Sequence, residues 1–95
     1  MNFKTTKIKS ALVKKGFVEI NGANHDKYIY HTQEGKKTSV FTFFSRGSAL
    51  KEYGESLLGP MRLQLKINKD QFSGLINCPL SQNNYEEILK SQGIV

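Results

Sequence analysis

The chain has 95 residues, 38% of them hydrophobic, and a formal net charge of +6, which suits one small domain with a single modest core. No apolar run approaches the ~20 residues that a membrane-spanning helix needs, and the N-terminus shows no signal peptide, so we expect a cytoplasmic protein without a membrane partner. The single cysteine excludes an internal disulfide and a multi-cysteine zinc site, and we expect neither a metal nor another cofactor.

The excess positive charge lies in the first half of the chain. Residues 1–50 contain nine lysine and arginine residues against three acidic residues, whereas residues 51–95 contain five of each. A polyanion, either a nucleic-acid backbone or an acidic protein, is the natural partner of such a half. A basic composition that serves only solubility is the alternative interpretation.

Residues 5–15 are predicted to form a helix, because apolar residues recur there at i, i+3 and i+4. This apolar stripe consists of Ile8, Ala11 and Leu12. A threonine, Thr5 or Thr6, can cap the start of the helix, and Gly16 can end it.

Three strands are predicted next, over residues 17–20, 27–32 and 37–44, where β-branched and aromatic residues are frequent. Residues 33–36 include a glycine and suit a hairpin turn, so we expect an antiparallel meander. Residues 40–44 are apolar at every position except one, which predicts that both faces of the third strand are covered there. The aromatic side chains expected in the core are Phe41, Phe43 and Phe44.

A second helix is predicted to run to about residue 66 after a polar loop. Its apolar stripe, also expected in the core, consists of Leu57, Leu58, Met61 and Leu65. Because Pro60 cannot donate to a preceding carbonyl, we expect the regular part to begin near Ser56 or Pro60, with a kink or a restart between them.

Two short helices are predicted in the last thirty residues. Asn68 and Gln71 resemble a capping box ahead of the first. Pro79 stops that helix, Ser81 can cap the second, and Gly93 can close it. The predicted fold is therefore α+β in a single domain, 1–95, with an α-β-β-β-α core over 1–66 and a helical C-terminal extension over 67–95.

His25 is the candidate for chemistry. It lies where a turn rich in Asn and Gly meets the second strand. A histidine titrates near neutral pH and can serve as a general acid or base, and Lys27, the next side chain on the same strand face, could offset the charge of a phosphate. The alternative interpretation is a turn histidine that bonds to its own loop.

The other candidate site residues in this region can each be explained either by a functional role or by a structural one. His31 is six residues beyond His25, roughly 20 Å along a strand, which is too far for both to contact one phosphate. Asp26 is expected to be a turn residue. Tyr28 and Tyr30 could stack on bases or pack in the core, and for Tyr28 we favour the core.

Phosphate contacts are expected from lysine and arginine side chains around the sheet and on the first helix. The candidates for RNA binding are Lys27, Lys36, Lys37, Arg46, Lys7 and Lys14. Lys7 and Lys14 share one flank of the helix, where a solvated surface is the alternative interpretation.

Four stretches follow one another in an order typical of one family. They are Lys15-Gly16-Phe17, Ala23-Asn24-His25-Asp26-Lys27-Tyr28, Gly35-Lys36-Lys37-Thr38 through Phe43, and Gly54-Glu55-Ser56-Leu57-Leu58. With them, the chain resembles the HicA toxins of HicA–HicB toxin–antitoxin pairs over roughly residues 5–66. The family's Gly-Ser-His corresponds to Ala23-Asn24-His25, and residues 67–95 are similar to the tail of its longer members.

The resemblance implies a fold like the double-stranded-RNA-binding domain, with both helices on one face of the sheet. It also implies a small, metal-independent ribonuclease that cuts mRNA, with His25 as the essential catalytic residue and an acidic HicB-type antitoxin as the partner that hides it. A non-catalytic RNA-binding module of the same fold is the alternative. A protein-interaction domain whose basic half meets only an acidic protein is a third possibility.

Overall fold

The computed structural model describes residues 2–45, 52–77 and 79–95, so the prediction for Arg46 lies outside the described residues. The secondary-structure elements in chain order are β1 (Phe3–Lys4), α1 (Thr5–Lys14), β2 (Phe17–Asn21), β3 (His25–His31), β4 (Lys37–Ser45), β5 (Glu52–Tyr53), α2 (Glu55–Leu65), α3 (Lys69–Asn77) and α4 (Gln82–Ser91).

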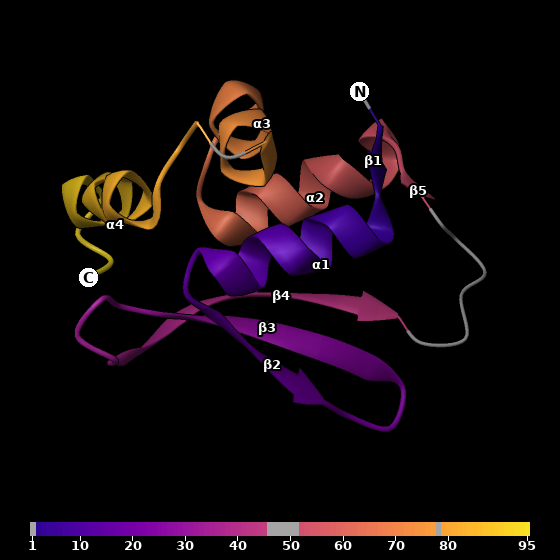
Figure 1. The fold of residues 1–95 in the computed structure, drawn as a ribbon, viewed down its shortest axis with the longest axis horizontal. Coiled ribbons are helices and arrows are strands. Elements are labelled where there is room, and N and C mark those ends of the chain that lie inside the picture. The colour runs from indigo at the N-terminus through magenta and orange to yellow at the C-terminus, as the bar shows by residue number, and fades with distance from the viewer. Residues whose placement is uncertain (1, 46–51, 78) are drawn as a thin grey trace.

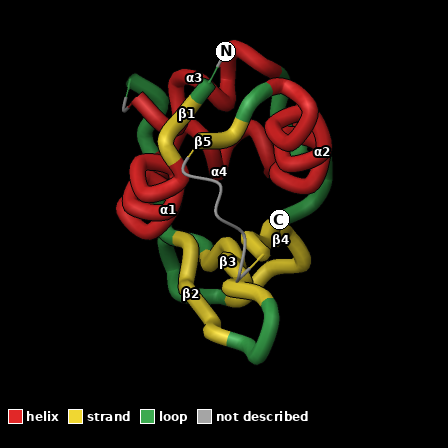
Figure 2. Tube along the Cα trace, turned by 90° about the vertical axis from the view of Figure 1, so that its right-hand side faces the viewer, coloured by secondary structure: helices red, strands yellow, loops and turns green. Residues whose placement is uncertain are grey.

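The predicted α+β class and three-stranded antiparallel sheet are confirmed. The strands lie in the order β2-β3-β4, and both neighbouring pairs are antiparallel. Helices α1 and α2 lie on the same side of this sheet, and no described helix covers its other side (Figures 1 and 2). We call this uncovered side the open face.

A second, two-stranded pair was not predicted. β1 pairs with β5, with Phe3 opposite Tyr53 and Lys4 opposite Glu52. Strands of two residues are too short to show an alternating pattern, so nothing in the sequence signals them. The prediction that a threonine caps the first helix is wrong, because α1 already begins at Thr5. Its N-cap residue is Lys4, which is extended in β1 and whose side chain makes no capping hydrogen bond.

Gly16 ends the first helix as predicted. Its φ is +99°, in the region that favours glycine. Its carbonyl accepts a hydrogen bond from the backbone N–H of His31 at 3.0 Å. A Cβ at this position would also clash with the side chain of Gln82 in α4. Glycine therefore allows the chain to turn directly from α1 into the sheet.

The prediction that both faces of β4 are covered is wrong. Val40, Thr42 and Phe44 face the helices and are at most 1% exposed. Phe41 and Phe43 lie on the open face and are 38% and 40% exposed. Successive strand residues point to opposite faces, and the helices supply cover for only one of them.

The second helix differs from its prediction in two respects. α2 begins at Glu55, next to the predicted Ser56, and continues through Pro60 without a restart. Pro60 and Ser56 are both exposed, so the carbonyl of Ser56, which Pro60 leaves without a helical donor, is open to water. Leu57, expected in the core, is 37% exposed.

The predicted caps of the last two helices are confirmed. The backbone N–H of Asn68 donates to Gln71 Oε1 at 2.9 Å, and that of Gln71 donates to Asn68 Oδ1 at 2.8 Å, which is a reciprocal capping box. At α4, the backbone N–H of Asn84 donates to Ser81 Oγ at 3.1 Å.

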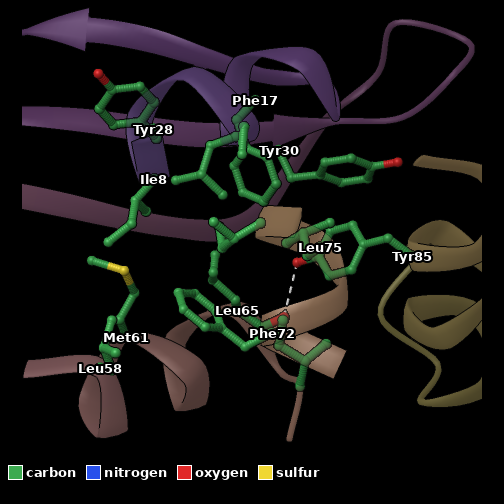
Figure 3. Close-up of a cluster of buried hydrophobic side chains, with 14 of the residues drawn as sticks. Ile8, Phe17, Tyr28, Tyr30, Leu58, Met61, Leu65, Phe72, Leu75 and Tyr85 are labelled. Atoms are coloured by element: carbon green, nitrogen blue, oxygen red, sulfur yellow. Dashed lines mark hydrogen bonds between the residues drawn. The ribbon is translucent and has the colours of Figure 1, made fainter. Parts of the chain in front are cut away.

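The helical tail packs into the same core as the rest of the chain (Figure 3). Tyr85 of α4 is fully buried, and its ring contacts those of Phe17 and Tyr30, with centroids 5.8 and 5.1 Å away. Its hydroxyl donates to the carbonyl of Leu65 at 2.8 Å. The hydroxyl of Tyr30 donates to the buried carboxylate of Glu86 at 2.7 Å, so α4 is joined directly to the central strand.

The four tyrosines should resist ionisation while the chain is folded. Burial raises the pKa of each above the ordinary value of about 10, with further contributions from a neighbouring carboxylate at Tyr28 and Tyr30. Each tyrosine therefore holds its proton more tightly in the folded chain than in the unfolded chain, which contributes to the free energy of unfolding. Since the folded-state pKa lies above the unfolded one, this contribution is complete below pH ~10 and is lost as the pH rises towards the folded-state pKa values.

We therefore expect absorbance at 295 nm, which reports tyrosinate, to rise only with alkaline unfolding. The same chain in denaturant should titrate with a midpoint near pH 10. A tyrosine that ionises near pH 10 in the folded protein would contradict the buried positions described above.

Candidate functional site

The open face presents apolar, aromatic and cationic side chains from all three strands. The side chains concerned are Val18 and Ile20 of β2, His25 and Lys27 of β3, and Phe41 and Phe43 of β4. The register places Lys27 between Ile20 and Phe43 across the sheet. Because alternate residues share a face, His25 lies one step further along β3 on the same side.

His25 is exposed at the first position of β3. The turn before it is closed by the backbone N–H of Gly22, which donates to the carbonyl of His25 at 2.8 Å. The imidazole contacts the ring of Phe43 at a centroid distance of 5.1 Å and an interplanar angle of 90°. No described residue of its loop forms a hydrogen bond with the imidazole, and His25 is exposed to a ligand on the open face.

Lys27 lies beside this histidine. Its Nζ is 4.3 Å from the centroid of Phe41, a cation–π arrangement that holds the ammonium group over the sheet. His25, Lys27, Phe41 and Phe43 together line a shallow groove of about 260 Å³. The groove therefore combines a proton-transfer group, a fixed positive charge and two aromatic rings.

The two acidic residues of β2, β3 and β4 lie on the helix-facing side of the sheet. Glu19 accepts a hydrogen bond from the hydroxyl of buried Tyr28. Asp26, expected in the turn, is instead the second residue of β3, and its carboxylate lies 3.5 Å from Lys9 Nζ of α1. Among the described outward-facing strand positions there is no carboxylate, so the electrostatics of the open face favour an anionic ligand.

The two tyrosines and His31 have structural positions. Tyr28 and Tyr30 are at most 1% exposed under the helices, so they cannot stack on a base. His31 is half-buried at the opposite end of β3 from His25, as its spacing predicted. The described residues therefore place one imidazole, and not two, at the groove.

The other predicted RNA-binding residues lie elsewhere. Lys36 and Lys37 are exposed beside a groove of about 350 Å³ at the far end of the sheet, where Glu34, Glu86 and Lys90 also contribute to the lining. Lys7 and Lys14 are exposed on α1, against α3. Of the predicted RNA-binding residues that the structure describes, only Lys27 lies next to His25.

Phe41 and Phe43 are the site residues that the sequence analysis missed. Their position could have been found from two signals taken together: they alternate with Val40, Thr42 and Phe44, and an antiparallel register opposite β3 places them on the face of Lys27. The alternation was not recognised because all the apolar residues of 40–44 were assigned to the core.

No protein-family model, curated protein or solved structure matches the chain. Within residues 2–45, 52–77 and 79–95, no three His, Cys, Asp or Glu side chains cluster closely enough to hold a metal ion. In the same part of the chain, no helix is both long and apolar enough to cross a membrane.

Proposed function

We propose that the chain is a toxin-type endoribonuclease of the HicA kind, which cuts mRNA without a metal and uses His25 for proton transfer. The observation that supports this most is an exposed imidazole beside Lys27 on a sheet face without a described carboxylate. The two helices on one side of a three-stranded antiparallel sheet are consistent with a double-stranded-RNA-binding-domain-like fold.

The reaction proposed is attack by a ribose 2′-oxygen on the adjacent phosphorus. A bond forms between that oxygen and phosphorus, the bond from phosphorus to the 5′-oxygen breaks, and the proton lost from the 2′-hydroxyl is balanced by one gained at the leaving oxygen. His25 can remove the first proton or supply the second. The ammonium group of Lys27 would offset the negative charge that develops on the phosphoryl oxygens.

The products expected are a 2′,3′-cyclic phosphate and a 5′-hydroxyl. End-labelled single-stranded RNA incubated with the purified protein and EDTA should yield fragments with these ends. Intact RNA with retarded mobility would instead support a non-catalytic RNA-binding module, and it would contradict the proposed reaction.

The non-catalytic module is the second candidate because the groove has a single imidazole. Two-group acid–base catalysis needs a partner for His25, and the described residues offer only Lys27 beside it. In both cases an acidic HicB-type antitoxin is the proposed protein partner, since exposed apolar and cationic side chains share the open face.

A further inference from the structure

We propose that Phe43 is a base-stacking residue, so that the open face binds RNA as a single strand with one unpaired base on this ring, directly beside His25. The inference deepens the proposed function and rests on it for the identity of the ligand. Stacking on Phe43 would be the contact that selects unpaired RNA.

The position of Phe43 supports this role. Phe43 is 40% exposed on the open face, opposite Lys27 in the register, and its ring centroid is 5.1 Å from that of His25. A base stacked on Phe43 would bring its own ribose, and the phosphate attached to it, next to the imidazole. Stacking would thereby place the 2′-hydroxyl at the group that moves its proton.

The neighbouring aromatic ring has a different role. Phe41 already has the ammonium group of Lys27 over it, at 4.3 Å from its centroid. That contact leaves Lys27 fixed above the groove, where it can meet the phosphate that follows the stacked base. Phe41 is thus a positioning residue for Lys27. Phe43, which the imidazole contacts at right angles and which is still 40% exposed, is the ring that would take the base.

The composition of the open face favours a single strand over a duplex. In an A-form duplex the base faces are covered by neighbouring bases, and duplex-binding domains contact phosphates and 2′-hydroxyls across successive grooves. The described lining of the groove consists of two phenylalanines, one histidine and one lysine, Lys27. Stacking on an aromatic ring tolerates any base, because every base has a π-face.

The test uses the absence of tryptophan from the chain. In Phe43→Trp the new indole is the sole tryptophan and keeps an aromatic ring at the site. Its fluorescence should be quenched by a short, fully 2′-O-methylated RNA strand, which cannot be cleaved. The same strand made abasic, or annealed to its complement, should not quench it.

Leu63→Trp is the matched control. Leu63 is 75% exposed on α2, away from the sheet, so its indole reports only non-specific binding. Binding of the 2′-O-methylated strand, followed by fluorescence anisotropy, should weaken by about 5- to 100-fold in Phe43→Leu, the loss expected for one stacked base, and should recover in Phe43→Trp.

Equal affinity of wild type and Phe43→Leu, or equal binding of the normal and abasic strands, would overturn the inference. So would the absence of RNA binding by the wild type at low salt, the result expected if the open face meets only a protein. Quenching at Phe43→Trp in a protein that leaves cleavable RNA intact would retain the stacking role and remove the nuclease proposal.

Discussion

Replacing His25 by alanine is expected to lower the rate of RNA cleavage by about 10²- to 10⁴-fold, the usual contribution of a positioned general acid or base. In free energy this is roughly 3–5 kcal/mol of transition-state stabilisation. The fold should remain intact, because the imidazole is exposed and its described ring contact is with Phe43, itself a surface residue.

The rate should be measured in single turnovers with excess protein and with EDTA present. Added imidazole should restore part of the lost activity in His25→Ala, since the vacated position is open to solvent. A merely structural histidine would not respond to imidazole in this way, so the rescue separates the two roles.

His31→Ala is the matched control for this experiment. It removes the same side chain from the opposite end of the same strand, where it is half-buried and outside the groove. Cleavage by this variant should match the wild type under conditions where it is folded. An unchanged rate in His25→Ala, or an equal loss in both variants, would remove the assignment of His25.

The elements that were predicted correctly are those with a strong local signal. Gly16 and the reciprocal caps of Asn68 and Gln71 involve contacts within a few residues, so the local sequence determines them. The same is true of the meander, because its turns are short and its strands are rich in β-branched and aromatic residues. The pairing of β1 with β5 joins residues about fifty positions apart and has no local signature.

For a related reason, only two of the four residues of the candidate site could be predicted from the sequence. His25 and Lys27 share a strand, so their common face follows from their spacing. The neighbouring rings of Phe41 and Phe43 belong to another strand, and their exposure depends on which side of the sheet the helices cover. Hydrophobic residues are ordinarily assigned to the core, and that assumption fails on a face with no covering layer.

Replacing Tyr85 by alanine should destabilise the whole domain by about 3–5 kcal/mol, the range for deleting a large buried aromatic side chain. The reason is that Tyr85 is fully buried and its ring contacts those of Phe17 and Tyr30 in the sheet. A small domain has a total stability of only ~5–15 kcal/mol. The loss should therefore be evident as a large decrease in the urea midpoint at an unchanged slope.

Two further variants separate packing from hydrogen bonding and from general surface effects. Tyr85→Phe keeps the ring contacts and removes the 2.8 Å hydrogen bond to the carbonyl of Leu65, so it should cost about 1 kcal/mol. Leu63→Ala, at a position 75% exposed, should change stability by no more than about 0.5 kcal/mol.

The outcome for Tyr85 bears on the open face as well. α4 contacts the helix-facing side of β3 through Tyr30 and Glu86, and the opposite side of the same strand presents Lys27 and His25. If Tyr85→Ala unfolds at nearly the wild-type urea concentration, the tail is dispensable to the core that supports this strand. If it unfolds at a much lower concentration, then the tail stabilises the helix-facing side of the sheet. The geometry of the groove then depends on a segment whose described residues contribute no side chain to its lining.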